Sequence, residues 1–263
     1  MPMETGGAGA ARANTVCPDC GGSGWKIIER AELSGAERCD CVAGERARRL
    51  EEKAAIPPLY RNASFDNFLL GENPIGHRDL ANVLLTVKSF SREFPTGRHL
   101  GLLLVGEPGT GKTHLAVAAL RILISRGFEG LFFDYQNLLD RIRAGFDQAS
   151  GSADREAYRF ALDAEVLLLD DLGAHRVTDW VEDTVTSIIT YRCNNRKPLI
   201  ATTNLPDPDA GSVMIDRSGV LGKPDYKTSL AERIGSRARS RLFEMCKVVR
   251  MPLVDDYRLR RFS

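Results

Sequence analysis

Residues 102–116 read LLLVGEPGTGKTHLA, and this stretch decides the fold of the chain. An apolar run typical of a buried strand leads directly into GEPGTGKT, and an apolar helical pattern follows it. Glycines in such a loop let the backbone curl, so that successive N–H groups and the helix N-terminus face an anion. A glycine-rich turn before an ordinary helix is the alternative, but strand and helix flank the motif as a phosphate-binding loop requires. The stretch therefore predicts such a loop.

The loop supplies candidate residues for binding ATP with its magnesium ion. Lys112 would reach the outer phosphates, and the hydroxyl of Thr113 would ligate Mg²⁺. His114 has a second interpretation, as an ordinary residue of the first helical turn. The residues expected to contact the nucleotide are Gly106, Glu107, Pro108, Gly109, Thr110, Gly111, Lys112, Thr113 and His114.

Two adjacent carboxylates, Asp170 and Asp171, end a second apolar strand, which is predicted at 166–170. Successive side chains of a strand point to opposite sides, so the two acids should have different functions. Asp170 would hold Mg²⁺, and Asp171 would polarise the attacking water. A solvated strand end before a turn is the alternative, but the position downstream of a phosphate-binding loop favours the catalytic interpretation.

A third apolar strand ends in the polar residues Thr202, Thr203 and Asn204. Parallel sheets gather ligand-binding groups at such strand ends. Asn204 would orient the attacking water or contact the γ-phosphate. Without the other two motifs, an Asn that starts a turn before Leu205 and Pro206 explains this position equally well.

The chain alternates strand patterns with helical patterns from about residue 60 onward. Strands are expected at 101–105, 130–134, 166–170, 198–202 and 248–251, and helices at 76–93, 111–126, 136–146, 155–164, 180–193 and 230–246. Residues 206–228 combine Pro and Gly with little periodicity, which predicts a long loop. This order indicates an α/β fold in which helices cover both faces of a parallel sheet. We therefore expect a three-layer P-loop NTPase fold.

Four of the six cysteines crowd the start of the chain: Cys17, Cys20, Cys39 and Cys41. Four thiolates in two close pairs suit tetrahedral Zn²⁺ in a closed structural site. Unligated thiols are the alternative, but this segment has few apolar residues and would then be unfolded. The sequence thus predicts a small N-terminal zinc-binding module.

Composition excludes several classes of protein. Lys and Arg total 36 against 35 Asp and Glu, and the net charge of +1 excludes a strongly basic nucleic-acid binder as a description of the whole chain. We expect no membrane partner, because no apolar run reaches the length of a membrane span. The N-terminus lacks the charged-then-apolar order of a secretory signal, which favours the cytoplasm.

Basic charge is concentrated near the C-terminus, where residues from 227 onward contain ten Lys or Arg against four Asp or Glu. Arg233, Arg237 and Arg241 recur every four residues and would share one face of a helix. Such a stripe suits phosphates or a neighbouring subunit, although a solvated arginine face is the simpler interpretation. A second candidate surface for single-stranded DNA follows the strand at 130–134, namely Tyr135, Arg141 and Arg143, with an exposed amphipathic helix as the favoured alternative.

Four motifs occur in the order GEPGTGKTHLA, LLLDDLG, IATTN and RARSRLFEMCKVV. Together they closely resemble the AAA+ ATPases of the DnaC family, the bacterial and phage loaders of the replicative helicase, with IstB-type transposition ATPases as near relatives. The resemblance covers about residues 56–261 and includes IPPLYRNASFDNF, which precedes the ATPase core. The first two motifs indicate only an ATPase, whereas the later two are more specific to the family.

The resemblance implies roles for individual residues. Asn204 occupies the sensor-1 position, and Arg258 resembles the sensor-2 arginine, which would touch the γ-phosphate of its own subunit. Arg241 matches the arginine finger that reaches the ATP of an adjacent subunit, and Arg237, one turn earlier, is the second candidate. A cation supplied in trans stabilises transition-state charge, so hydrolysis waits for assembly.

A DnaC-type protein would be an Mg²⁺-dependent ATPase that delivers a hexameric replicative helicase onto single-stranded DNA and self-associates into a ring or spiral. In such a loader, the zinc module would contact the helicase. A transposition helper ATPase of the IstB type, acting on duplex DNA, and an adaptor that holds ATP without turnover are the alternatives. The expected domains are a disordered N-terminus at 1–16, the zinc module at 17–43, a charged helix and hinge at 44–58 and the AAA+ ATPase domain at 59–263.

Overall fold

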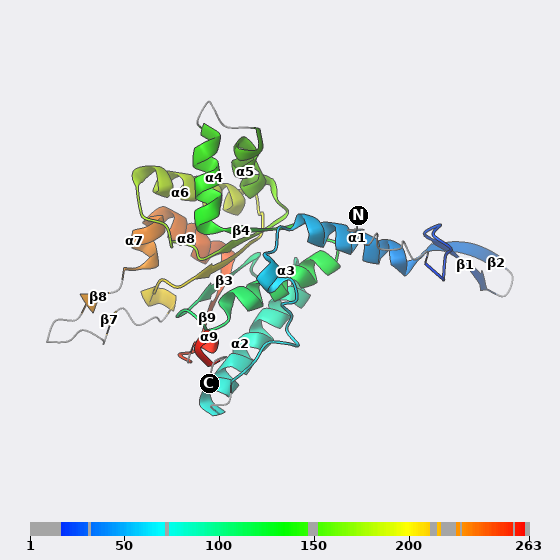
Figure 1. Ribbon diagram of the computed structural model, residues 1–263, viewed down its shortest axis with the longest axis horizontal. Helices are drawn as coiled ribbons and strands as arrows, with labels where there is room; N and C mark the ends of the chain where they lie inside the picture. The colour runs from blue at the N-terminus through cyan, green and yellow to red at the C-terminus, as the bar shows by residue number, and fades with distance from the viewer. Residues whose placement is uncertain are drawn as a thin grey trace, which may run out of the picture. The chain divides into compact units, whose positions relative to one another are not determined.

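The computed structural model describes residues 17–30, 33–71, 74–146, 152–210, 215–216, 225–226, 228–254 and 256–260. The chain divides into two compact units, Met1–Arg46 and Ala47–Ser263 (Figure 1). The disordered N-terminus expected at 1–16 lies outside the described residues. None of the described helices is both long and apolar enough to cross a membrane.

The first unit contains an antiparallel hairpin of β1 (Trp25–Arg30) and β2 (Leu33–Arg38), in which Trp25 faces Arg38. Its strands mix charged, apolar and small residues, so the hydrophobic pattern does not predict them. Helix α1 (Asp40–Lys53) follows and begins earlier than the charge pattern predicts. Asp40 in its first turn explains this start, because a carboxylate is favourable at a helix N-terminus.

The second unit is built on a five-stranded parallel sheet in the order β4-β5-β6-β3-β9. The strands are β3 (Gly101–Val105), β4 (Gly130–Asp134), β5 (Val166–Asp170), β6 (Leu199–Thr203) and β9 (Cys246–Arg250). All residues of β3, β5 and β6 are buried, because helices cover both faces of the sheet. Only β6 and β9 are displaced, by one or two residues, from their predicted positions.

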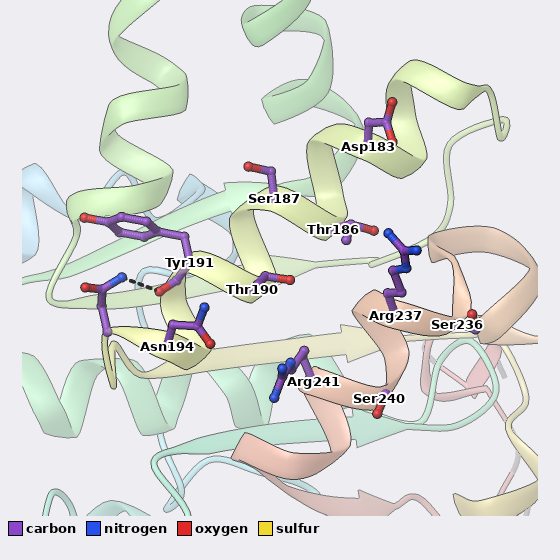
Figure 2. Close-up of a pocket in the computed structure, with 11 residues that line it drawn as sticks. Asp183, Thr186, Ser187, Thr190, Tyr191, Asn194, Ser236, Arg237, Ser240 and Arg241 are labelled. Carbon is purple, nitrogen blue, oxygen red and sulfur yellow. Dashed lines mark hydrogen bonds between the residues drawn. The ribbon is translucent and has the colours of Figure 1, made fainter.

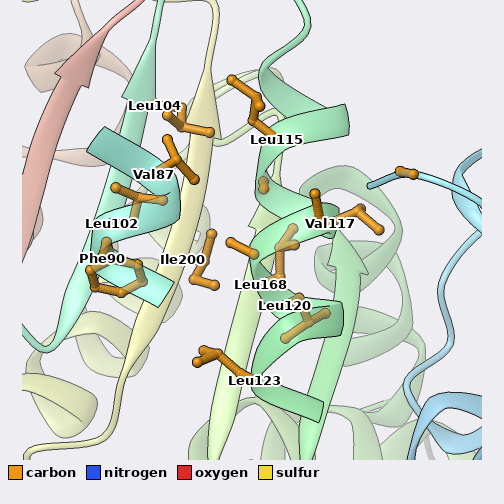
Figure 3. Packing of buried hydrophobic residues seen from close by; sticks show 14 of the residues in the cluster. Val87, Phe90, Leu102, Leu104, Leu115, Val117, Leu120, Leu123, Leu168 and Ile200 are labelled. Carbon is orange, nitrogen blue, oxygen red and sulfur yellow. The ribbon is translucent and has the colours of Figure 1, made fainter. Parts of the chain in front are cut away.

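Alternate residues of the strands build two hydrophobic clusters, one on each face of the sheet. Leu102 and Leu104 of β3 pack against α2 (Pro74–Glu93) and α3 (Lys112–Ser125), as Figure 3 shows. The neighbouring residue Leu103 points to the opposite face. The three-layer α/β fold predicted from the sequence is thereby confirmed.

The opposite face carries the other helices that contribute to the core. These are α4 (Tyr135–Phe146), α5 (Ser152–Asp163), α6 (Asp179–Asn194), α7 (Leu230–Ile234) and α8 (Ser236–Met245). The short elements are the 3-10 helices η1 (Pro58–Tyr60) and η2 (Pro208–Ala210), helix α9 (Tyr257–Arg260) and the ladder of β7 (Ile215–Asp216) with β8 (Asp225–Tyr226). The predicted loop at 206–228 therefore contains short structured pieces where it is described.

The prediction of a single helix at 230–246 is wrong, because the helix is interrupted at Gly235. This glycine has a φ of 82°, and a Cβ there would collide with the carboxyl group of Glu182. Two helices result, α7 and α8. Arg233 lies on α7, whereas Arg237 and Arg241 lie on α8. The prediction that the three arginines share one helical face is therefore wrong.

Candidate nucleotide-binding site

The phosphate-binding loop connects the end of β3 to the start of α3, where its N–H groups precede the helix. Gly109 and Gly111 have φ values of 75° and 90°, in the left-handed region that favours glycine. A Cβ at Gly111 would lie 2.5 Å from the Phe68 ring, and a Cβ at Gly109 would overlap the Asp256 carboxyl group. Both glycines are therefore required by conformation and by space.

Lys112 is buried at the first position of α3, and its Nζ donates a 2.8 Å hydrogen bond to the Glu107 carbonyl. Burial lowers the pKa of Lys112 to about 8, although the nearby carboxylates of Asp171 and Asp170 act in the opposite direction. The ammonium is thus held inside the loop at a place where the charge of a phosphate would stabilise it.

Asp170 ends β5 and faces two hydroxyl groups. Thr113 Oγ1 donates to its carboxylate at 2.9 Å, and Thr202 Oγ1 donates at 2.6 Å. Burial raises the pKa of Asp170, whereas these two hydrogen bonds act to lower it. A carboxylate beside a threonine hydroxyl supplies the hard oxygen ligands that Mg²⁺ prefers, so these residues fit the ion.

Asp171 has a different partner from Asp170. Asn204 donates a 2.6 Å hydrogen bond from Nδ2 to Asp171 Oδ1. The φ of Asp171 is 55°, in a region that non-glycine residues adopt mainly at turns and functional sites. The two acids therefore stand in separate environments, one beside Thr113 and the other beside Asn204.

Thr202 is the residue of this site that the sequence-based reasoning missed. Its hydroxyl donates to Asp170 and accepts a 2.9 Å hydrogen bond from the backbone N–H of Asp171. Thr202 is fully buried near the end of β6, after the apolar residues 199–201. The sequence contains a signal for this role, namely a threonine in a strand that is predicted to be buried. A buried hydroxyl needs a hydrogen-bonding partner.

The segment after β9 lies against the phosphate-binding loop. Tyr257 donates a backbone hydrogen bond of 3.2 Å to the Gly109 carbonyl, and Arg258 donates one of 2.8 Å to the Asp256 side chain. The charge of Arg258 contributes to lowering the pKa of Lys112, which places the two cations near one another. The sensor-2 role that the resemblance implies for Arg258 stays a prediction.

His114 contacts the segment at residues 64–68. Its Nε2 lies 2.8 Å from the Ser64 carbonyl, and its ring packs against Phe68 with the centroids 5.5 Å apart. The histidine thereby fixes the 64–68 segment on α3. Its contact with the nucleotide stays a prediction.

A groove of about 950 Å³, lined mainly by polar side chains, runs between the exposed faces of α6 and α8. Figure 2 shows Arg237 and Arg241 of α8 beside the hydroxyl and amide side chains of α6, among them Thr190 and Asn194. Arg241 Nη1 donates to the Glu244 carboxylate at 2.7 Å. Both arginines are exposed enough to reach a second molecule.

The candidate DNA contact through Tyr135 is wrong. Only 1% of Tyr135 is exposed, so its ring packs in the core and cannot stack on a base. Arg141 and Arg143 lie over the rings of Phe133 and Trp180, with distances to the centroids of 5.7 and 4.7 Å.

The four N-terminal cysteines converge as expected from their spacing. Their Sγ atoms all lie within 4.8 Å of one another, with Cys17 to Cys39 at 3.8 Å and Cys20 to Cys41 at 3.5 Å. Tetrahedral zinc with Zn–S bonds of about 2.3 Å holds its sulfurs about 3.8 Å apart. The donor set and its spacing therefore fit zinc.

The sequence model of the family described as IstB-like ATP binding protein matches residues 86–220. The chain belongs to this family. A solved structure of the DnaC helicase loader is 32% identical, with a TM-score of 0.59 over 74% of this chain and 100% of that one. The resemblance to DnaC-family AAA+ proteins seen in the sequence is thereby confirmed.

Other relatives of this AAA+ protein are more distant. YqaM of Bacillus subtilis is 29% identical over 72% of this chain. The matched region covers 59% of the length of YqaM. The replicative helicase loader DnaC of Escherichia coli is 24% identical over 69% of this chain and 73% of its own. A DnaI crystal structure, at 19% identity and a TM-score of 0.54, shares the fold.

The family description, an ATP binding protein, identifies ATP as the nucleotide that the family binds. Around its phosphate-binding loop the structure brings together Lys112, Thr113, Asp170, Asp171 and Asn204 through the contacts given above. Arg237 and Arg241 belong to the groove between α6 and α8.

Proposed function

We propose that this AAA+ protein is an ATP-hydrolysing loader that delivers a hexameric replicative helicase onto single-stranded DNA. The observation that carries the proposal is the 32% identity with the DnaC helicase loader over the full length of that solved chain. A place in DNA replication is the broader conclusion that the same relatives support, and helicase loading is the specific form in which we propose it.

Hydrolysis would use the residues around the phosphate-binding loop. Lys112 would neutralise the outer phosphates, and Thr113 with Asp170 would hold Mg²⁺, which neutralises developing charge when bound. Asp171 would polarise the attacking water, with Asn204 fixing the orientation of that carboxylate through their 2.6 Å hydrogen bond. Arg258 would contact the γ-phosphate within the same subunit.

Arg241 is proposed as the finger that acts on the ATP of a neighbouring subunit, with Arg237 as the second candidate. Arg241 pairs with Glu244 of its own helix and lines the groove between α6 and α8, outside the phosphate-binding loop of its own chain. The open groove beside it would receive the nucleotide-bearing face of a second copy. Self-association into a ring or spiral follows from this arrangement.

Zinc is proposed at the four cysteines, whose sulfur spacing fits the ion. The metal would fold the hairpin unit, which has few apolar residues of its own. Trp25 and Ile27 are 50% and 80% exposed on one side of β1, as a surface that contacts another protein would be. We propose that this unit binds the helicase.

The test is a loading assay with the replicative helicase of the source organism on closed circular single-stranded DNA that carries a labelled complementary strand. A helicase ring cannot thread onto a circle, so strand displacement should require this protein and ATP. A chain without residues 1–46 should still hydrolyse ATP but should no longer stimulate strand displacement by the helicase. Displacement that is equal with and without the protein, together with no helicase complex in a pull-down, would overturn the proposal.

A transposition helper is the second candidate, because the matched family takes its description from IstB-like proteins. Such a protein would form filaments on duplex DNA and bind a transposase. Recovery of a transposase in the pull-down, with the helicase absent, would favour it. An adaptor without turnover is excluded if the purified protein hydrolyses ATP and Asp171→Asn abolishes that hydrolysis.

A further inference from the structure

A buried ion pair joins the segment after β6 to helix α8. The Asp207 side chain is fully buried, and it lies on the same short segment as Asn204. Arg239 donates from Nε to Asp207 Oδ2 at 2.8 Å and from Nη2 to Asp207 Oδ1 at 2.7 Å, and it also contacts the Asp209 carboxylate. A two-pronged pair of this kind fixes orientation as well as distance.

In the sequence, Arg239 lies between the two groove residues Arg237 and Arg241, but its side chain leaves α8 on a different side. Residues two apart differ by about 200° around a helix, so Arg239 points away from Arg237 and Arg241. The Arg239 guanidinium packs 4.3 Å from the centroid of the Phe243 ring. The pair with Asp207 thus anchors α8 on one side, while Arg237 and Arg241 line the groove on another.

The segment between Asn204 and Asp207 is itself held rigidly. Thr203 Oγ1 donates to the Leu172 carbonyl at 2.8 Å and accepts the Leu205 N–H at 3.2 Å. The Pro206 carbonyl accepts a 3.0 Å hydrogen bond from Leu230 at the start of α7. One short segment therefore contacts Asp171 through Asn204 at one end and α8 through Asp207 at the other.

We propose that Asp207 and Arg239 are positioning residues that set Arg241 relative to the sensor residue Asn204. The inference rests on the proposed function, in which Arg241 acts in trans. Neither residue of the pair touches the nucleotide. They act through α8, so the pair fixes the position of the finger that this subunit offers to its neighbour.

The experiment mixes two inactive full-length variants in the presence of ATP and single-stranded DNA. Asp171→Asn keeps its finger but cannot hydrolyse its own ATP, and Arg241→Ala keeps its own site but offers no finger. The mixture should recover hydrolysis, because the finger of the first variant reaches the ATP of the second. Arg239→Gln is then added to one partner or to the other.

Arg239→Gln in the Asp171→Asn partner should lower the recovered turnover by about a hundredfold, the effect of misplacing a reacting group by about 1 Å. The same change in the Arg241→Ala partner should leave the recovered turnover unchanged. Asp207→Asn should give the same asymmetry, and Arg239→Lys, which keeps the charge without the fork, should give an intermediate loss. Binding of a fluorescent ATP analogue should be unchanged in every double variant.

An equal loss in both placements indicates a merely structural residue and overturns the inference, as does a loss in neither. If the two parent variants recover no hydrolysis when mixed, the finger in trans is wrong, and the inference fails with it. These outcomes separate the failure of the positioning pair from the failure of the proposed finger.

Discussion

The hydroxyl of Thr202 donates a 2.6 Å hydrogen bond to the carboxylate of Asp170. The same oxygen accepts the N–H of Asp171, so one side chain of β6 fixes the end of the neighbouring strand β5. The strained backbone of Asp171, with its φ of 55°, is held in this way. The geometry of both acids therefore depends on a residue that contacts neither water nor metal in the proposed mechanism.

Replacing this hydroxyl by a methyl group, Thr202→Val, should slow ATP hydrolysis by about tenfold to a hundredfold, since both acids lose a positioning contact. The protein should also lose about 1–3 kcal/mol of unfolding free energy, because the Asp171 N–H is left without its acceptor and the Asp170 carboxylate keeps only the Thr113 hydroxyl as a donor. Steady-state turnover and thermal denaturation measure the two effects. Thr202→Ser, which keeps the hydroxyl, is the matched control and should retain most of the activity; equal turnover of the Val and Ser variants would contradict the role given to the hydroxyl.

Lys112 and Asp171 should separate nucleotide binding from turnover. Lys112→Ala removes the ammonium that faces the phosphates and is expected to abolish ATP binding. Asp171→Asn keeps the shape of the side chain and should bind ATP normally while hydrolysis stops. Titration with a fluorescent ATP analogue and a phosphate-release assay give the two readouts. Hydrolysis by Asp171→Asn at the wild-type rate would show that another group activates the water.

Nucleotide binding should weaken as pH rises through about 8, where the pKa of Lys112 lies because burial lowers it. Above that pH the free protein carries a neutral amine, so binding of a phosphate requires a proton to be taken up. Calorimetry of ADP binding in EDTA, in buffers of different ionisation enthalpy, should detect this uptake. Lys112→Arg stays charged over the same range and should remove the pH dependence of the uptake. A wild-type affinity that is flat from about pH 7 to pH 9 would contradict the lowered pKa.

Zinc removal should unfold the hairpin unit without disturbing the nucleotide site. Elemental analysis of protein purified without added metal should give about one zinc per chain, from one closed site of four thiolates. Cys20→Ser should lower this content and increase proteolysis within residues 17–46, while Cys193→Ser, outside the cluster, should leave the zinc content unchanged. ATP binding should be the same in both variants. Absence of zinc under reducing conditions would contradict the site.

The parts of the fold that the sequence predicts best are those marked by continuous apolar runs or by a motif of fixed spacing. The phosphate-binding loop combines an apolar run with a fixed spacing of glycines, Lys and Thr, so the positions of β3 and of the start of α3 are predicted almost to the residue. Asp170, Asp171 and Asn204 follow such strands, and parallel pairing brings strand ends together. Position in a parallel sheet thus made these contacts predictable.

Other features depend on tertiary contacts that leave little trace in a local pattern. Gly235 sits inside a helical stretch, and a single glycine there is usually tolerated, yet here the contact with Glu182 and the positive φ divide the helix. The hairpin β1 and β2 alternates too weakly to be recognised. Tyr135 directly follows β4, at a strand end where ligand-binding residues often lie. Its ring nevertheless packs in the core, and the local sequence pattern does not reveal this.

The sheet order has a consequence for how the chain is made on the ribosome. β9 is the last strand of the sheet to be synthesised, yet it pairs with β3, whose end leads into the phosphate-binding loop. The segment that follows β9 then meets this loop, through Tyr257 and Gly109. A nascent chain therefore exposes its phosphate-binding loop long before the residues that support it have left the exit tunnel. ATP should bind only after β9 and the segment around Tyr257 have been made, so the nucleotide reports that synthesis of this ATPase unit is complete.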